Sequence, residues 1–246
     1  MRVLTYNVHS CIGTDGKHAP ERIAEAIASA EPDVVCLQEL DLRRAKTLHA
    51  DQSRLIADYL DMTFEFHPTV KRKDEHFGDA ILSKHPMTLV RATTFPPVPR
   101  PIPNELRGAV WTKVIMGGDV WQVMNTHFGL GREERRLQAR HFATDWIAQA
   151  MPGPLVVCGD LNSRPGSAVH RMLARDVVDV YRSSGAHRGR TFSTGLPLLC
   201  LDYVFATPSV RVNRVEVLRT PLSRIASDHF PIIADLELPP ALPASA

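Results

Sequence analysis

Residues 33–39 read DVVCLQE, and this short stretch restricts the fold more than any other part of the sequence. Val34, Val35, Cys36 and Leu37 form an apolar run without the alternation that a half-exposed strand shows. Such runs are typical of strands buried on both faces, because other layers of structure cover both sides of the sheet. We therefore expect a layered α/β fold in which Glu39 lies at the end of a buried strand.

Strand and helix patterns alternate along the rest of the chain. A strand is expected at residues 2–8, and Pro20 opens a helix whose Ile23 and Ile27 share one face. A Gly-Gly-Asp turn at 117–119 predicts a hairpin. Further helices are expected at 51–60, 139–150 and 167–174, and strands at 80–83, 87–90, 109–116, 120–125, 155–158, 202–206, 210–219 and 230–238. The pattern predicts one α/β domain with two sheets over residues 1–238.

Composition narrows the class of protein. The net charge of +2 over 246 residues indicates neither nucleic acid nor an anionic membrane as a partner. Without an apolar run of about 18 residues or a signal segment, we expect a cytoplasmic protein with no integral membrane segment, and we predict no protein partner. Four scattered cysteines predict buried free thiols. Proline-rich residues 95–104 predict a surface loop, and residues 239–246 predict a flexible tail.

Polar clusters interrupt or follow several of the predicted strands. They are Thr5-Tyr6-Asn7, Leu37-Gln38-Glu39, Thr126-His127-Phe128, Gly159-Asp160-Leu161-Asn162, Leu201-Asp202-Tyr203 and Ser227-Asp228-His229. Each cluster alone has a structural explanation, since a buried Asn or Glu can satisfy backbone groups and GDLN can form a turn. Strand ends that converge on one sheet edge would instead bring the clusters into one pocket.

The clusters occur in a diagnostic order. The opening strand with Asn7 and the strings LQE, GDAILS, NTHF, GDLN, LDYVF and SDHFP span nearly the whole chain. In this order they resemble the endonuclease/exonuclease/phosphatase family, the deoxyribonuclease I-like proteins, and NTHFGLGREERRLQ is similar to small bacterial members. The resemblance implies a four-layered α/β/β/α sandwich of two mixed sheets flanked by helices. It also implies metal-dependent hydrolysis of phosphoester bonds.

The resemblance assigns a metal role to three residues. Glu39 and Asn7 would bind a divalent cation, and Asp228 would approach it directly or through water. Carboxylate and amide oxygens without clustered thiols suit Mg²⁺ or Mn²⁺ better than structural zinc. The expected cofactor is therefore Mg²⁺ or Mn²⁺.

The same resemblance assigns five catalytic residues. Asp160 would position and deprotonate the attacking water, and Asn162 would donate to the phosphoryl group from the same side of an extended segment. His229 would contact a phosphate oxygen as an imidazolium, with Asp202 accepting from its other ring nitrogen. His127 would bind phosphate or protonate the leaving group, with a purely structural histidine as the alternative.

Two further positions carry expectations about the metal and the substrate. Asp79 departs from the commoner family string GNAILS, and it would orient His127, raise metal affinity or simply open a strand. Arg107 falls at a family position and would reach a substrate phosphate through its planar fork, with a surface ion pair as the alternative.

The expected function is hydrolysis of a phosphoester, most readily a phosphodiester, in a phospholipid headgroup, a nucleic acid or a small molecule. An endonuclease or exonuclease acting on DNA or RNA is the first alternative, and a non-catalytic module that binds a phosphate ligand is the second. The basic residues 71–73 and the arginines at 132, 135, 136 and 140 would track a polyanion or remain solvated. Selectivity is expected to depend on loops at 11–19, 67–78, 95–107 and 183–200.

Overall fold

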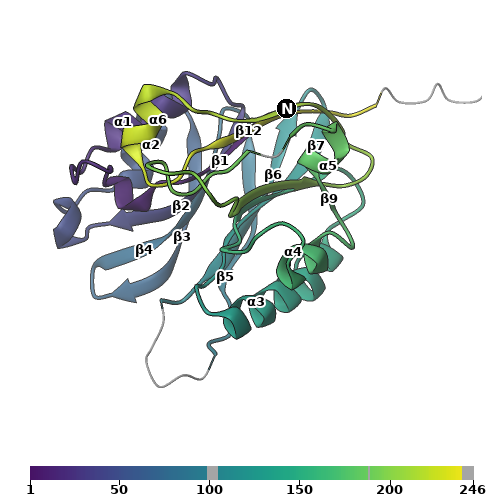
Figure 1. The fold of residues 1–246 in the computed structure, drawn as a ribbon, viewed down its shortest axis with the longest axis horizontal. Coiled ribbons are helices and arrows are strands. Elements are labelled where there is room, and N and C mark those ends of the chain that lie inside the picture. Colours follow the sequence, from purple (N-terminus) through teal and green to yellow (C-terminus); the bar gives the residue numbers. More distant parts are fainter. Residues whose placement is uncertain (99–104, 188, 240–246) are drawn as a thin grey trace, which may run out of the picture.

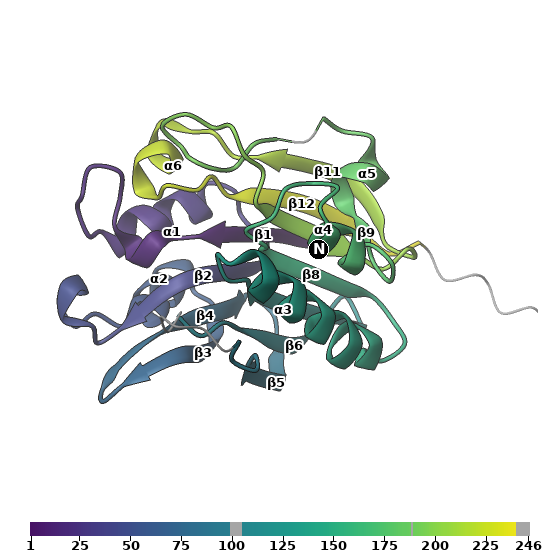
Figure 2. The ribbon, with the colours of Figure 1, turned by 60° about the horizontal axis from the view of Figure 1, so that its bottom comes forward.

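Two six-stranded sheets lie face to face in the computed structural model, which describes residues 1–98, 105–187 and 189–239 (Figures 1 and 2). The first sheet has the order β11-β12-β1-β2-β4-β3, with β1 Arg2–Asn7, β2 Val34–Leu42, β3 Thr63–Arg72, β4 Glu75–Ser83, β11 Arg211–Val217 and β12 Ile232–Glu237. The second has the order β5-β6-β7-β8-β10-β9, with β5 Met87–Thr94, β6 Gly108–Met116, β7 Asp119–His127, β8 Leu155–Asp160, β9 Val178–Asp179 and β10 Asp202–Ala206.

Helices cover the outer face of each sheet. They are α1 Pro20–Ala28, α2 Gln52–Leu60, α3 Arg132–Asp145, α4 Ala168–Leu173 and α6 Pro221–Ala226, with short 3₁₀ turns η1 His9–Cys11, η2 Ala45–Thr47 and η3 Ile147–Gln149. The remaining helix, α5 Val180–Ser184, instead adds Val180 and Tyr181 to the core between the sheets. Figure 1 shows α1, α2 and α6 together on one side of the molecule and α3 with α4 on the other. Local sequence sets their starts: Pro20 opens α1, and the Asp51 side chain caps α2 by accepting from the Arg54 N–H at 3.1 Å.

The apolar run in β2 is divided between two cores. Val34 and Cys36 face the second sheet, and their neighbours Val35 and Leu37 pack with residues of α1 and α2. A third core lies between the second sheet and α3 with α4, where Phe142 is fully buried. Both faces of both sheets are therefore covered, and the predicted α/β/β/α sandwich is confirmed.

Two local predictions, the hairpin and the buried free thiols, are also confirmed. The hairpin of β6 and β7 turns at Gly117 and Gly118, whose φ angles of 63° and 89° favour glycine. The four cysteines are buried and free. Among the described residues, no helix is long and apolar enough to cross a membrane. The proline-rich residues 99–104 and the tail residues 240–246 lie outside the described part of the chain.

Two predictions in the first sheet are wrong. Residues 67–78 were expected as a loop, but β3 and β4 pair through them as an antiparallel hairpin. Proline is tolerated there because β3 is an edge strand whose register shifts between Pro68 and Val70. Strand β2 was expected to end at Glu39 and instead continues to Leu42. Glu39 therefore lies inside β2 and not at its end.

We predict that Phe142→Ala lowers the free energy of unfolding by about 3–5 kcal/mol, because it empties a fully buried aromatic position between α3 and the second sheet. Leu137→Ala on the same helix is the matched control, since Leu137 is 41% exposed, and its cost should stay within about 1 kcal/mol. Urea unfolding followed by circular dichroism measures both values. Equal costs for the two variants would contradict the assigned inner face of α3.

Candidate active site

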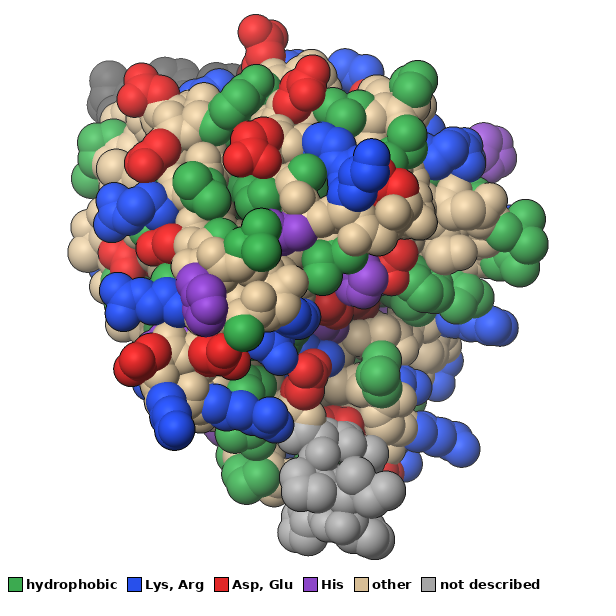
Figure 3. Space-filling view, turned by 90° about the vertical axis from the view of Figure 1, so that its left-hand side faces the viewer, with side chains coloured by type: hydrophobic (Ala, Val, Ile, Leu, Met, Phe, Trp, Pro, Cys, Tyr) green, Lys and Arg blue, Asp and Glu red, His purple; other side chains and the backbone are tan. Residues whose placement is uncertain are grey.

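Strand ends from both sheets meet at one edge of the sandwich. Asn7 ends β1, and His127 and Asp160 end the neighbouring parallel strands β7 and β8. Asp202 begins β10 directly opposite Asp160 in an antiparallel pair. Parallel strands that end side by side bring residues from distant sequence positions together. Figure 3 views the molecule from this side and shows acidic and histidine side chains among Lys and Arg side chains.

A β-bulge directs Glu39 into this edge. The register between β2 and β4 shifts between Leu37 and Leu40, and Glu39 adopts a φ angle of 63°. A bulge changes the direction of a side chain without ending the strand. The buried Asp79 carboxylate accepts from the Glu39 backbone N–H at 3.4 Å, so the bulge is supported from β4.

Asn7 joins the two sheets at the centre of the site. Its Nδ2 donates to Glu39 Oε1 and to Asp160 Oδ2, each at 3.1 Å. Its Oδ1 accepts from the backbone N–H of His9 at 3.1 Å. The carboxamide therefore presents its amino group to both carboxylates. The oxygen that the sequence prediction assigned to a cation is bound to backbone in this arrangement.

Asp160 is a buried carboxyl group with a raised pKa. Burial raises this pKa to about 7, and the nearby Asp202 carboxylate acts in the same direction. The charge of His229, the Asn162 N–H at 2.8 Å from Oδ1, and Asn7 partly oppose the rise. The pKa of the Asp160 carboxyl group therefore lies close to neutral pH.

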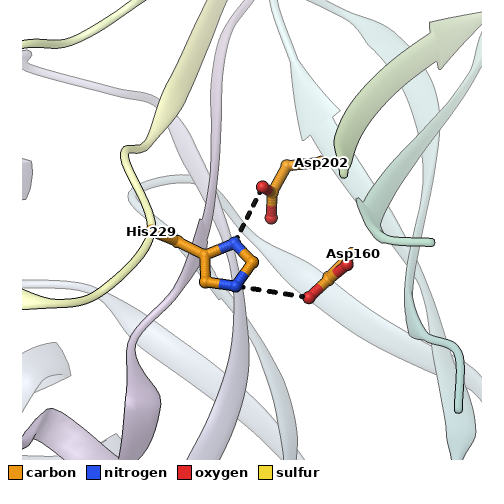
Figure 4. A group of neighbouring side chains, drawn as sticks. All are labelled: Asp160, Asp202 and His229. Atoms are coloured by element: carbon orange, nitrogen blue, oxygen red, sulfur yellow. Dashed lines mark hydrogen bonds and ion pairs between the residues drawn. The ribbon is translucent and has the colours of Figure 1, made fainter. Parts of the chain in front are cut away.

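His229 lies between two carboxylates, as Figure 4 shows. Its Nδ1 is 2.9 Å from Asp202 Oδ2, and its Nε2 is 3.7 Å from Asp160 Oδ2. Burial lowers the pKa of His229, but Asp202 and Asp160 outweigh that effect and raise it to about 10. The ring is therefore an imidazolium, and its Nε2–H points toward the site without a short contact to Asp160.

His127, by contrast, is neutral. Burial lowers its pKa well below the usual value, and the charges of Arg107 and His229 lower it further. Arg107 Nη1 is 3.3 Å from His127 Nδ1, and a guanidinium can only donate. Nδ1 is therefore the acceptor, and the ring proton lies on Nε2. That atom is 3.6 Å from Asp160 Oδ2 and 3.8 Å from Glu39 Oε1.

Asn162 faces the site through a turn, which corrects the expectation of an extended segment. Its φ angle is 46°, and its backbone N–H folds back onto the Asp160 carboxylate. Its Nδ2 donates to the Phe128 carbonyl at 2.8 Å. Nδ2 also lies 3.2 Å from His127 Nε2, but with the ring proton on Nε2 both atoms are donors, so this contact is not a hydrogen bond. The GDLN string is therefore a strand end followed by a tight turn, in which the side chains of residues 160 and 162 still reach one site.

Asp79 and Arg107 are two buried charged residues next to the site. Burial raises the pKa of Asp79 to about 7, and the charge of Arg107 partly opposes this rise. Arg107 is 7% exposed, contacts the Phe77 ring and pairs with Glu105 at 3.3 Å. Arg107 thus supports His127 from behind, and Asp79 supports the Glu39 backbone.

Asp228 is at the margin of the cluster. It is half-buried, and its side chain accepts from the Ser227 hydroxyl at 3.4 Å. Within the part of the chain that the structure describes, no hydrogen bond joins Asp228 to Glu39 or Asn7. Nine of the ten predicted positions thus lie in one hydrogen-bonded or ion-paired cluster, and Asp228 enters it only as the neighbour of His229.

Sequence reasoning missed two residues that shape the site. Asn125 donates from Nδ2 to the Leu37 and Ala80 carbonyls at 2.8 and 2.9 Å, and so links the sheets behind the site. Its signal was a polar residue at the end of an apolar strand pattern. Phe192 packs its ring against His229 with centroids 4.8 Å apart. It lies in a segment expected only as a loop, where no sequence signal marks it.

The donor set fits a hard divalent cation. Asp160, Asp202 and His229 offer ligand atoms within 4.8 Å of one another. A histidine must be neutral to bind a metal, whereas His229 is protonated and bonded to Asp202. The Glu39 side chain is 22% exposed and free of such a competing cation. Carboxylate oxygens are the main ligand atoms both in the group of Asp160, Asp202 and His229 and at Glu39, which suits Mg²⁺ or Mn²⁺.

We predict that Asp79→Asn stabilises the metal-free protein in a pH-dependent manner. The folded-state pKa of Asp79 is about 7 against an ordinary value of 3.8, so its contribution to stability is present below pH 3.8 and is lost as pH rises through 7. The gain from the variant should therefore grow between pH 4 and 7, by up to about 1.4 kcal/mol per pH unit, and level off above pH 8.

Urea unfolding in EDTA at pH 5, 6, 7 and 8.5 measures this gain. Asp119→Asn, at an exposed position on β7, is the control and should show no such dependence. A gain from Asp79→Asn that is the same at every pH would contradict a buried carboxyl of raised pKa.

Comparison with known proteins finds structures of similar overall fold. An endonuclease/exonuclease/phosphatase structure from Beutenbergia cavernae has a TM-score of 0.76 and 25% identity, covering 97% of this chain and 71% of that one. One from Bacteroides vulgatus has a TM-score of 0.77 and 24% identity, covering 97% and 98%. A mannosyl-6-phosphatase from Bacteroides thetaiotaomicron has a TM-score of 0.75 and 19% identity, covering 97% and 100%.

These likenesses establish the deoxyribonuclease I-like fold. None of the curated proteins compared with this chain matches it. The sequence pattern of one family matches residues 4–229, which is nearly the whole described structure. The chain therefore belongs to the endonuclease/exonuclease/phosphatase family.

Proposed function

We propose that this chain hydrolyses phosphoester bonds, most readily phosphodiesters, by attack of water with the help of Mg²⁺ or Mn²⁺. Members of its family are hydrolases that act on phosphoester bonds. The observation that carries the proposal is the gap of 3.7 Å between His229 Nε2 and Asp160 Oδ2. An imidazolium donor and a carboxylate base face one another there without a short contact, which leaves both available to a substrate.

Asp160 is the proposed base for the attacking water. A carboxyl with a pKa of about 7 accepts a proton near neutral pH far better than an ordinary aspartate does. Asn7 and the Asn162 N–H bind separate oxygens of this carboxylate and so fix its orientation. Asn162 is proposed to donate from its side chain to the phosphoryl group.

His229 is the proposed donor to a non-bridging phosphate oxygen. Asp202 holds its Nδ1 and keeps the ring charged, so the Nε2–H stabilises negative charge that develops during attack. His127, neutral and protonated on Nε2, donates without charge to the phosphate or leaving group. The two histidines thus offer two donors of different strength to one phosphoryl group.

Glu39 and Asp228 are proposed to hold the cation together with Asn7 Oδ1. This oxygen has a second lone pair besides the one that accepts from the His9 N–H. When bound, the cation neutralises charge on the phosphoryl oxygens. Asn7 orients the Glu39 carboxylate from Nδ2, and Asp79 fixes the backbone from which that carboxylate projects. The protein groups therefore set the direction of the Glu39 oxygens before any cation is present.

We predict that His229→Ala lowers kcat by about 10²–10⁴, with a smaller change in KM, because it removes a charge-bearing donor to the transition state. The assay is hydrolysis of a panel in Mg²⁺ or Mn²⁺: a chromogenic phosphodiester, single- and double-stranded DNA, RNA, sphingomyelin and inositol phosphates. Preferred cleavage of DNA or RNA would select the nuclease alternative.

A second His–Asp pair supplies the matched control. His170 Nε2 is 2.8 Å from Asp179 Oδ2, and the His170 ring lies against the rings of Tyr203 and Phe205. His170→Gln should keep kcat within about twofold if only the site pair acts in catalysis. Equal loss in both variants would contradict a specific role for the site pair. No turnover on any substrate despite metal binding would favour the non-catalytic binding module.

We predict that Glu39→Gln weakens Mn²⁺ binding by at least about tenfold, because it removes the accessible carboxylate charge. Asp202→Asn should leave Mn²⁺ affinity nearly unchanged while lowering kcat, since Asp202 is bound to His229. Isothermal titration calorimetry after EDTA treatment and dialysis measures the affinity. The reverse result would move the cation to the Asp160, Asp202 and His229 group.

A further inference from the structure

A largely apolar recess adjoins the candidate site. It encloses about 780 Å³, within the range of small-molecule pockets. Its walls include Phe192, Leu196, Leu198 and Leu199 from the segment before β10, with Pro165 from the segment after Asn162. Leu196 and Leu198 are 66% and 58% exposed, which is unusual for two leucines so close together. Solvent therefore meets a concave apolar surface here.

One aromatic ring separates this recess from the catalytic histidine. Phe192 lines the recess and packs against His229, with ring centroids 4.8 Å apart. The two wall segments also lie close to the site in sequence, because one follows Asn162 and the other precedes Asp202. A phosphoester held at His229 would thus place one of its ester groups beside the recess.

The polar groups of the recess favour an anionic ligand with few hydrogen-bonding atoms. Arg164 and Arg190 line it, and neither guanidinium has an ion-pair partner among the described residues. No Asp or Glu is among the described lining residues. Among the described lining side chains, the guanidiniums can only donate and Ser193 supplies the only hydroxyl, so the N–H donors of a nucleobase edge would be left largely unpaired. An alkyl or simple aryl group meets no such penalty.

We propose that this recess binds the apolar alcohol portion of a small, freely dissolved anionic phosphoester, with Arg164 and Arg190 attracting the anion. The inference rests on the proposed function, and it assigns the substrate class as phosphoesters of short aliphatic or aryl alcohols. Phe192, Leu196 and Leu198 then determine specificity through apolar contact. The attraction that the two arginines exert on the anion does not depend on the length of the alkyl chain, and salt screens it.

Binding of methyl, butyl and octyl phosphate to the full chain in Mg²⁺, measured by calorimetry, tests the proposal without requiring turnover. Each methylene that enters the recess should raise affinity by about fourfold, so octyl phosphate should bind at least tenfold more tightly than methyl phosphate. The double variant Leu196→Asn with Leu198→Asn should remove most of this gain in affinity per methylene. Arg190→Gln should weaken the binding of all three ligands by the same factor.

Two controls separate the recess from general effects. Leu130→Asn alters a leucine that is 73% exposed outside the recess, and Arg182→Gln alters an exposed arginine on α5, so both should leave the series unchanged. Equal affinity for methyl and octyl phosphate in the unaltered protein would overturn the proposal. So would tighter binding of a nucleoside monophosphate than of octyl phosphate, or binding confined to phospholipid vesicles. Absence of hydrolysis alone, with the gain in affinity per methylene intact, would overturn only the proposed function.

Discussion

Buried hydrogen bonds between the two sheets fix where the site can form. Asn125 of β7 bonds the carbonyls of Leu37 in β2 and Ala80 in β4, and its Oδ1 accepts from Gln38 Nε2 at 2.7 Å. These groups are shielded from water, so losing one partner would leave a buried polar atom unsatisfied at a cost of about 1–3 kcal/mol. The bonds therefore hold the sheets in one register. Asn7 can bridge Glu39 and Asp160 only because that register is fixed.

The same arrangement gives two neighbouring histidines different charge states, one protonated and one neutral. His229 is protonated because Asp202 and Asp160 outweigh the effect of burial, whereas His127 is neutral because Arg107 adds to it. Groups whose pKa values are driven apart in this way are suited to different tasks in one reaction. The difference comes from neighbours, since both rings are buried to a similar degree.

A His–Asp contact alone does not indicate catalysis in this chain. His170 and Asp179 are as close as His229 and Asp202, yet His170 also accepts from the Gly166 N–H and stacks on Tyr203. Both of its ring nitrogens are thus used within the protein. His229 instead directs Nε2 into a space bounded by Asp160 and adjoining an apolar recess. The free donor, rather than the pair, distinguishes the candidate site.

The sequence by itself determined the layered fold, because uninterrupted apolar strands need cover on both faces. The order of its polar motifs, through a family resemblance, nominated the site residues but left out Asn125 and Phe192. The sequence did not determine the β3–β4 hairpin, the bulge at Glu39 or the turn at Asn162, since these depend on register shifts and backbone angles that residue types permit without requiring. Only the tertiary structure decided that the Asn7 oxygen is bound to backbone and that Phe192 lies against His229. Those contacts join segments distant in sequence, and packing between the sheets and loops selects them.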